Sequence, residues 1–452
     1  MQKFKTSSLD NFDNKHKNLI KKIKKKLNSF NYSIFTHNFD IPAYFATYAN
    51  GPGLHYIQKH LTQKNNFLLS LIHSLKDFFY LLNYNEIKIL NYKKITAKKA
   101  VFTWAFRENF KRDGSLEDRY LNINTRKLKD IHWIVLYIGE KLPAKIDNNI
   151  ILIQTINKKK FKPFLLLKVL LSNLKYLFFD YHYFLFSISS HNFLAKKIFT
   201  KLNKVIKKPI NTVLFIYEAQ PFQNQIIKHL KKKNIKTLGY IHSPPLALPT
   251  NLVKKKYSPS KIFVNGIDQK KCFIKLGWKK KEIEVIPSTR FLKVKKNFTS
   301  QIFLPISIKS SGKILKNLEF LITNIKLDLN EFKIKNHPAS IHSRKNNELV
   351  NEIKKLKKKY SHISKNSSNF KNYSIFLGAS GAIIEALERG CKVIQITEIP
   401  ILDFYSKYFW NSIKSKKINE NIFTYSLIKK GNLINLGKKP KNLDLFFNKR
   451  TN

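Results

Sequence analysis

Residues 373–396 read YSIFLGASGAIIEALERGCKVIQI, and this stretch decides the fold class. Its two ends, 373–377 and 392–396, are short runs rich in β-branched and aromatic residues, as expected of buried strands. The apolar segment 381–388 between them is expected to be a helix. A strand, a helix and a second strand in this order predict a parallel βαβ unit.

The same alternation extends toward the N-terminus. We expect strands at 212–217, 237–242, 261–265, 282–286, 301–308 and 331–335, and helices at 223–233, 312–325 and 343–358. A Lys- and Asn-rich connector at 295–300 separates two such series. The sequence therefore predicts an α/β fold with two Rossmann-like, doubly wound lobes, 1–295 and 296–452, and a chain of 452 residues is long enough for two cores.

The strongest compositional feature is the net charge of +57. A polycation binds phosphate polymers non-specifically, so nucleic acid is a candidate partner. Only eight of the 85 basic residues are Arg, however, and reading of base edges relies on Arg. Lys is spread along the whole chain, which favours a solvated basic surface without specific nucleic acid binding. Attraction to an anionic membrane face is a further alternative.

Cysteine use and the first residues indicate the compartment. Cys272 and Cys391 are the only cysteines and lie far apart in sequence, so no disulfide framework or metal-binding pair is expected. Residues 1–30 carry Lys throughout and have no apolar core of the kind found in a secretory signal peptide. We therefore expect a cytoplasmic protein, peripheral at the inner face of the inner membrane if it binds lipid.

Two segments bear on membrane contact. Residues 164–194 are apolar but interrupted by charged residues at intervals too short for a span, so we expect buried helices there. Between residues 19 and 27 an apolar stripe runs through a Lys-dense segment, which suits either an anionic lipid surface or an ordinary amphipathic surface helix. The stripe consists of Leu19, Ile20, Ile23 and Leu27.

In open parallel sheets, ligands bind beyond the carboxyl ends of the strands. The strand at 331–335 runs into His337 and Pro338, which would leave an imidazole at the strand tip. The second strand exit, 378–382, has small residues that let a ligand approach the backbone, and the helix start that follows is a seat for phosphate. A tight βα turn capped by Ser380 would have the same sequence.

Glu385 places a carboxylate within the apolar helix that follows this turn. Burying an unpaired carboxylate is costly, so a polar partner is expected. A ribose hydroxyl and a salt bridge to a neighbouring Lys both satisfy this requirement, and the sequence leaves the two open.

Two segments, 335–338 (KNHP) and 378–390 (GASGAIIEALERG), resemble the HP and Ser motifs of bacterial GT-B transferases. Upstream segments resemble transferases that build surface carbohydrate; these are 110–120, 217–222, 239–243, 264–266 and 288–290. The resemblance implies a GT-B-like fold whose lobes face across a cleft, with a nucleotide-sugar donor on the second lobe and the acceptor on the first. The acceptor would be a capsule or lipopolysaccharide saccharide, or a lipid-linked one.

Under this resemblance, the donor phosphate and nucleotide would contact the strand-exit segments of the second lobe. The donor-binding candidates are His337, Pro338, Gly378, Ser380, Gly381 and Glu385. Glycosyl transfer also needs a base for the acceptor proton. Our candidates are Glu218, which we favour, Asp113 and Asp118, and the residues expected to face the cleft are Gln220, His242 and Arg290.

The sequence contains no DxD, HExxH, Walker-A or GxGxxG motif. We therefore expect transfer without a metal ion or cofactor, the nucleotide-sugar being a substrate. Alternatives are a polyol-phosphate transferase using a CDP-glycerol-type donor, a nucleotide-sugar epimerase, and a non-catalytic polycation that binds nucleic acid or membrane.

Overall fold

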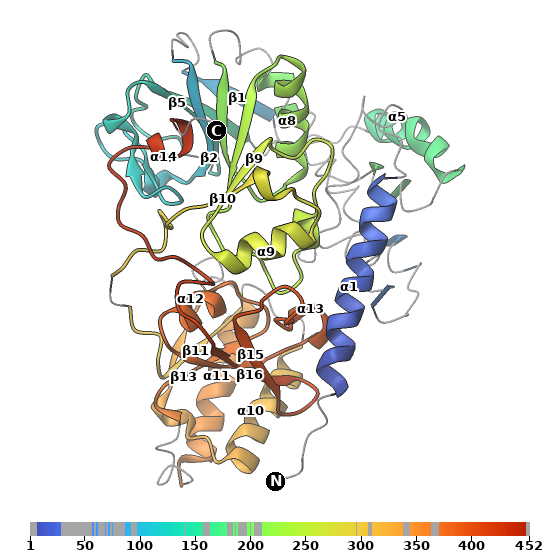
Figure 1. The fold of residues 1–452 in the computed structure, drawn as a ribbon, viewed down its shortest axis with the longest axis vertical. Helices are drawn as coiled ribbons and strands as arrows, with labels where there is room; N and C mark the ends of the chain where they lie inside the picture. The colour runs from blue at the N-terminus through green and yellow to red at the C-terminus, as the bar shows by residue number, and fades with distance from the viewer. Residues whose placement is uncertain are drawn as a thin grey trace.

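The computed structural model describes most of the chain. The described residues are 7–28, 86–91, 97–139, 141–156, 163–178, 210–294, 296–305, 310–337, 344–362 and 370–448, with isolated positions at 57–75 and 184–202. Two lobes are stacked along the long axis, each built on a twisted sheet (Figure 1).

The first lobe contains an eight-stranded sheet in the order β1-β6-β5-β2-β7-β8-β9-β10. Its strands are β1 (Glu86–Leu90), β2 (Lys99–Ala105), β5 (Ile131–Tyr137), β6 (Ile150–Ile156), β7 (Thr212–Ile216), β8 (Lys236–Tyr240), β9 (Lys261–Val264) and β10 (Ile283–Val285). All neighbours are parallel except β1, which is antiparallel to β6. Every residue of β5 is buried, as expected of a strand covered on both faces.

The strand order makes this lobe doubly wound. From β2 the chain adds β5 and β6 on one side, and then β7 to β10 on the other. The direction of winding therefore reverses between β2 and β7, and such a switch point is where Rossmann sheets bind ligands. Helices α8 (Pro221–Lys232) and α9 (Ile267–Lys275) connect strands of the second half.

The second lobe contains a six-stranded sheet in the order β12-β11-β13-β14-β16-β15. Its elements are β11 (Gln301–Phe303), α10 (Ser311–Ile325), β12 (Lys333–Lys335), α11 (Arg344–Lys359), β13 (Tyr373–Leu377), α12 (Ala382–Glu388), β14 (Lys392–Ile396), α13 (Pro400–Asp403), β15 (Ile413–Lys417) and β16 (Ile422–Leu427). Strands β11 to β14 are parallel, with a second switch point between β11 and β13. The expected α/β fold of two Rossmann-like lobes is confirmed.

The end of the chain returns to the first lobe, which corrects the expected division at residue 295. The amide of Gly437 donates to the carbonyl of Phe291 at 2.9 Å, and the amide of Ser288 donates to Asn435 at 2.8 Å. Helix α14 (Asp444–Phe447) then places Phe446 5.1 Å from the ring of Tyr240, within the first core. Residues 432–448, the return segment, therefore belong structurally to the first lobe.

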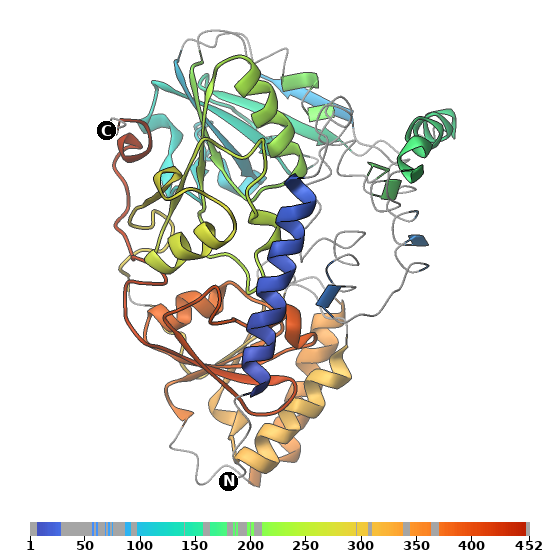
Figure 2. The ribbon, with the colours of Figure 1, turned by 45° about the vertical axis from the view of Figure 1, so that its right-hand side comes forward.

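The first helix, α1 (Ser7–Asn28), runs along both lobes (Figures 1 and 2). Phe12 packs on Phe404 in the second lobe with ring centroids 5.6 Å apart, and His16 contacts the carbonyl of Ile401 at 2.6 Å. The apolar stripe of this helix (Leu19, Ile20, Ile23 and Leu27) is buried against the protein. Of the two alternatives for the stripe, contact with lipid is therefore excluded by its burial.

Residues 163–178 differ from the buried helices expected there. They form α5 (Pro163–Asn173) and a 3-10 turn, η5 (Leu174–Phe178), but Phe164 and Phe178 are 85% and 90% exposed. The rest of the segment 179–194 lies largely outside the described residues. Among the helices that the structure describes, none combines the length and apolarity needed to cross a bilayer.

The return segment offers a test of the packing between the chain end and the first lobe. A Cβ on Gly437 would lie 1.9 Å from the carbonyl oxygen of Ser288, so Gly437→Ala forces backbone atoms apart. We expect a loss of about 3 kcal/mol in the free energy of unfolding, measured by denaturant titration. Gly312→Ala is the control, because a Cβ there meets nothing within 4 Å. Equal stability of the two variants would contradict this account of the contact.

Candidate functional site

The first switch point is occupied by the loop that leaves β7. This loop begins with Glu218 and turns sharply at Ala219, whose φ of 58° is in the left-handed region that non-glycine residues rarely adopt. Gln223 holds the turn: its side-chain oxygen accepts from the amides of Glu218 at 3.0 Å and Gln220 at 3.2 Å. Its amide group donates to the carbonyl of Ile216 at 2.6 Å. The position of Glu218 is thus fixed by backbone contacts.

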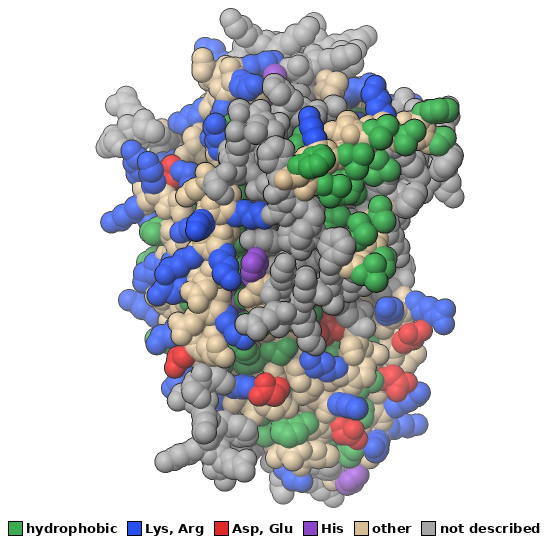
Figure 3. Space-filling model, turned by 90° about the vertical axis from the view of Figure 1, so that its right-hand side faces the viewer, with side chains coloured by type: hydrophobic (Ala, Val, Ile, Leu, Met, Phe, Trp, Pro, Cys, Tyr) green, Lys and Arg blue, Asp and Glu red, His purple; other side chains and the backbone are tan. Residues whose placement is uncertain are grey.

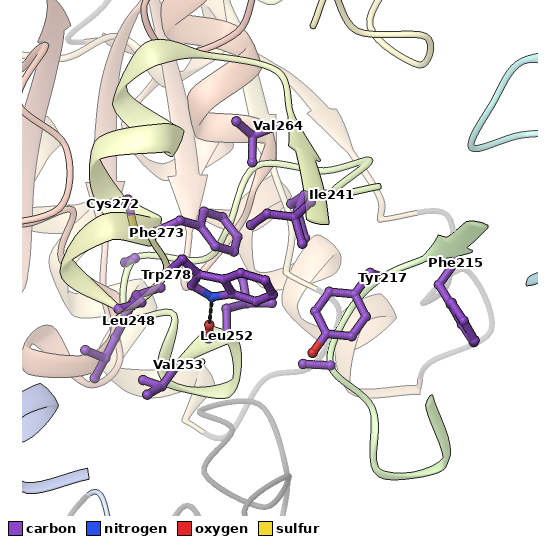
Figure 4. Packing of buried hydrophobic residues seen from close by; sticks show 14 of the residues in the cluster. Phe215, Tyr217, Ile241, Leu248, Leu252, Val253, Val264, Cys272, Phe273 and Trp278 are labelled. Atoms are coloured by element: carbon purple, nitrogen blue, oxygen red, sulfur yellow. Dashed lines mark hydrogen bonds between the residues drawn. The ribbon is translucent and has the colours of Figure 1, made fainter. Parts of the chain in front are cut away.

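Apolar packing behind the loop also holds Glu218 in position. Tyr217 and Ile241, the residues just before Glu218 and His242, point into one apolar cluster around Trp278 (Figure 4). The indole of Trp278 donates to the carbonyl of Leu252 at 2.9 Å, which satisfies its polar atom inside the core. The two candidate side chains therefore follow directly on residues that are anchored in the same core.

Glu218 and His242 meet at the carboxyl ends of β7 and β8. The Nε2 atom of His242 lies 3.5 Å from Oε1 of Glu218. Burial lowers the pKa of His242 well below its usual range, and the nearby charge of Arg290 lowers it further. Burial raises the pKa of Glu218, against smaller opposing effects of Gln220 and Arg290. At neutral pH the imidazole of His242 is therefore uncharged.

The two side chains differ in their access to solvent. Glu218 keeps 39% of its side-chain surface exposed, while His242 keeps 4%. The Nδ1 atom of His242 is buried and has no hydrogen-bond partner among the described residues. An external molecule can thus reach the carboxylate of Glu218, which has a higher pKa than an ordinary Glu and is therefore a better proton acceptor.

Tyr120 and Arg290 complete this cluster. The ring of Tyr120 lies 4.6 Å from that of His242 in an edge-on arrangement, and the guanidinium of Arg290 is 5.9 Å from the Tyr120 ring. Arg290 also donates to Oγ of Ser243. Burial and the charge of Glu218 raise the pKa of Tyr120 to about 12, so its hydroxyl stays protonated. We call Tyr120, Glu218, His242 and Arg290 the first-lobe cluster.

Asp118, a candidate base, is bonded to the backbone of the loop that carries Tyr120. Its carboxylate is 1% exposed and accepts from Oγ1 of Thr103 at 2.6 Å and from the amides of Tyr120 at 2.9 Å and Leu121 at 2.6 Å. Burial raises its pKa to about 6. Because all these contacts are internal, Asp118 is suited to hold the Tyr120 loop, and Glu218 is the more accessible carboxylate.

Asp113, the other candidate base, lies on the loop surface. It pairs with Arg126 at 2.8 Å, and its side chain accepts from the amide and hydroxyl of Ser115. Hydrogen bonds from Ser115 lower its pKa. Among the residues that the structure describes, Asp113 contacts no member of the first-lobe cluster, so the structure does not bring the three candidate bases together.

On the second lobe, the turn after β13 exposes backbone donors at its switch point. Gly378 adopts a φ of 73°, and the following residues, Ala379, Ser380 and Gly381, are half-buried or exposed. Their three amides donate no hydrogen bond to another described residue. Consecutive free amides after a left-handed residue form a concave site that suits an anion.

The helix that follows contributes less than expected. Helix α12 has seven residues, and its first amide, that of Ala382, already donates to Oγ of Ser380 at 3.3 Å. The amides of Ile383 and Ile384 donate to the carbonyls of Ser380 and Gly381. The N-cap position itself is Gly381, which has no side-chain cap, so Ser380 satisfies the first helical amide from one residue earlier. The free donors lie in the turn before the helix.

The two switch points face each other. A Cβ placed on Gly381 would lie 3.6 Å from the carbonyl oxygen of Pro244, which follows His242 and Ser243 in the first lobe. Gly381 and Pro244 therefore follow strands of different sheets but lie on the two sides of one contact. This contact brings the free amides of 379–381 to the side of the molecule that carries the first-lobe cluster.

The second donor candidate, His337, lies at the same edge of the second sheet. It follows β12, which is separated from β13 by β11 alone, and all three strands run parallel. Strands two apart are about 10 Å from one another. Burial lowers the pKa of His337, which is half-buried. Pro338 lies outside the described residues.

Glu385 points to the connector between the lobes. Its carboxylate pairs with Arg389 at 2.9 Å and with Lys296 at 3.2 Å, and it is 6% exposed. Arg389 in turn donates to the carbonyls of Leu292 and Val294. The salt bridge left open by the sequence is therefore present, and it fastens α12 to the crossing between the two lobes.

Sequence reasoning missed two members of this arrangement. Tyr120 ends the segment 110–120, and its ring lies edge-on against His242 while its backbone amide donates to Asp118. Tyr405 was not considered, yet its hydroxyl donates to the carbonyl of Ser380 at 2.8 Å and holds the turn. Neither tyrosine has a sequence signal, because each acts through a contact between segments distant in the chain. In the part of the chain that the structure describes, no group of three or more His, Cys, Asp or Glu is placed to hold a metal ion.

Comparison with known proteins gives a weak structural match. No protein-family model and no curated protein matches the sequence. Among solved structures, the chain is similar to UDP-GlcNAc 2-epimerase from Neisseria meningitidis bound to UDP-GlcNAc, at 13% identity and a TM-score of 0.33. The match covers 66% of this chain and 83% of that one. The fold assignment rests on the strand orders of the two sheets.

Proposed function

We propose that this chain is a glycosyltransferase that moves a sugar from a nucleotide-sugar to a hydroxyl of a surface polysaccharide or lipid-linked acceptor. One observation carries the proposal. The first-lobe cluster, with the accessible carboxylate of Glu218, lies at one switch point, and the free amides of 379–381 lie at the other. The contact of Gly381 with Pro244 brings these two parts of the lobes together.

The roles follow from charge and access. Glu218 accepts the proton of the acceptor hydroxyl, because its pKa is raised and its side chain reaches solvent. Negative charge develops on the departing phosphate, and Arg290 together with the amides of 379–381 supplies positive charge and hydrogen-bond donors for it. His242 and Tyr120 act as positioning residues, since they lie against Glu218 and Arg290, His242 being buried and Tyr120 half-buried. His337 would bind the nucleotide from the same edge of the second sheet.

A donor panel tests this function. The purified protein is incubated with CMP-, CDP-, UDP- and GDP-linked donors, with and without saccharide and lipid-linked acceptors, and the released nucleotide is identified. We expect acceptor-dependent release of the nucleotide that carried the sugar, a nucleoside diphosphate from a CDP-, UDP- or GDP-sugar and CMP from a CMP-sugar. Release of CMP from CDP-glycerol would indicate polyol-phosphate transfer instead. Conversion of the sugar without an acceptor would indicate an epimerase, and no turnover with any donor would favour the non-catalytic polycation.

We expect turnover to be independent of divalent metal. Arg290 and the backbone amides of 379–381 would stabilise the negative charge of the leaving phosphate, a role that a carboxylate-bound cation has in other enzymes. Saturating EDTA should therefore leave kcat close to its value in buffer, because the charge on the leaving phosphate is stabilised without a cation. Loss of activity in EDTA, restored by Mg²⁺ or Mn²⁺, would contradict this part of the proposal.

A further inference from the structure

Helix α5 and the turn η5 expose a row of large apolar side chains. The row advances in steps of three and four residues, which places its members on one face of a helix. Val169, Asn173 and Tyr176, on the opposite side, are buried. The exposed row, called the α5 face below, consists of Phe164 (85% exposed), Leu167 (55%), Leu171 (59%), Leu174 (41%) and Phe178 (90%).

Such a row differs from the scattered apolar residues found on every protein surface, because its members are contiguous. In Figure 3 the α5 region shows as a patch of hydrophobic side chains at the upper right of the face. Figure 2 shows α5 projecting outward from the body of the first lobe. A projecting face of this kind can meet a broad, flat surface more easily than it can receive a peptide in a groove.

The charges around the α5 face indicate which surface it meets. Residues 163–178 contain no Asp or Glu. Lys168 and Lys175 are exposed, and each follows directly on a member of the row, Leu167 or Leu174. A second copy of the chain would bring the same lysines face to face, so self-association at this surface is opposed by like charges. An anionic surface would instead be attracted by them.

We propose that the α5 face is a membrane-contact surface, which inserts its apolar side chains into the interface of an anionic lipid bilayer. Helix α5 has 11 residues, and a span needs about 20. It is therefore suited to lie in the plane of the interface, with the lysines at the level of the headgroups. This surface is argued from α5 and η5 alone and does not depend on the reaction proposed above.

The first test measures binding of the full-length protein to vesicles. Wild type should co-sediment with vesicles containing phosphatidylglycerol and weakly with phosphatidylcholine alone. The triple variant Phe164→Ser, Leu171→Ser, Phe178→Ser should bind about 100-fold more weakly, since three large side chains lose their burial in lipid. The double variant Val294→Ser, Ile428→Ser is the control and should bind as wild type does, because these apolar residues are also exposed, at 58% and 64%, but lie elsewhere.

The second test separates the contribution of the lysine charges from the insertion of the apolar side chains. Lys168→Gln with Lys175→Gln should weaken binding to anionic vesicles about 20-fold and leave the weak binding to neutral vesicles unchanged. Leu171→Cys carrying an environment-sensitive fluorophore should shift its emission to the blue on vesicle binding. Cys272 and Cys391 are buried, so the label is directed to the new thiol.

Three results would overturn the proposal. The first is that the triple variant binds anionic vesicles as tightly as wild type does. The second is that the emission of the fluorophore at Leu171→Cys does not shift while the protein is bound. The third is that wild type binds vesicles of neither composition, while sedimentation shows that the triple variant has a different oligomeric state. That result would assign the α5 face to a contact with a second copy of the chain.

Discussion

Glu218→Gln is expected to reduce kcat by about 10²- to 10⁴-fold, the usual contribution of a positioned general base. The amide cannot accept the acceptor proton, but it keeps the size of the side chain and its contact with His242. The melting temperature and donor affinity should therefore remain close to those of the wild type. Glu348→Gln, on exposed helix α11, is the matched control and should leave kcat unchanged.

The pH profile supplies a second measurement on the same variant. Burial raises the pKa of Glu218 above its ordinary value of 4.5. As the pH falls through this raised pKa, the carboxylate is protonated and can no longer accept a proton, so kcat/KM falls on the acid side. The Glu218→Gln variant should lack this acid limb. A variant with wild-type kcat, or with the same limb, would remove Glu218 from the mechanism.

Arg290→Gln is expected to lower kcat by about 10²- to 10³-fold, because a donor aimed at the departing phosphate is lost. It should also move the acid limb of the wild-type profile to higher pH. The reason is that the charge of Arg290 now lowers the pKa of Glu218, and without it that pKa rises further. A merely structural role for Arg290 would change the melting temperature without this shift.

Two further variants make that result easier to interpret. Arg290→Lys keeps the charge but not the planar donors, so it should restore the position of the acid limb and recover only part of kcat. Arg344→Gln removes an arginine that is 93% exposed on α11 and should match the wild type. An unshifted limb in Arg290→Gln would show that the two groups are not coupled as their geometry suggests.

The parallel strands β7, β8, β13 and β14 were predictable because each is a short, mostly apolar run that is buried over nearly all of its length. Strands β7, β8, β13 and β14 begin and end within a few residues of the expected positions. The hairpin β15–β16 was not predicted, since the expected alternation of strands and helices ends at residue 396. Pairing with a distant strand, here β14, leaves no local pattern in the sequence.

Side-chain environment was less predictable than secondary structure. The stripe on α1 and the row on α5 are both apolar at helical spacing, yet the first is buried and the second exposed. The spacing shows only that a face is apolar, and what covers it depends on the packing of distant segments. In the same way, Glu218 and Asp118 both carry carboxylates near strand ends, but only the fold shows that one reaches solvent and the other does not.

The return segment has a consequence for how the protein is made. The side chains of Leu443 and Phe446 complete the core beneath the first sheet, although they are synthesised after the whole second lobe. A nascent chain on the ribosome would therefore finish the second lobe before the first can close its core. Premature termination near residue 430 would leave the first lobe with an uncovered apolar surface, and chaperones would be expected to bind it there.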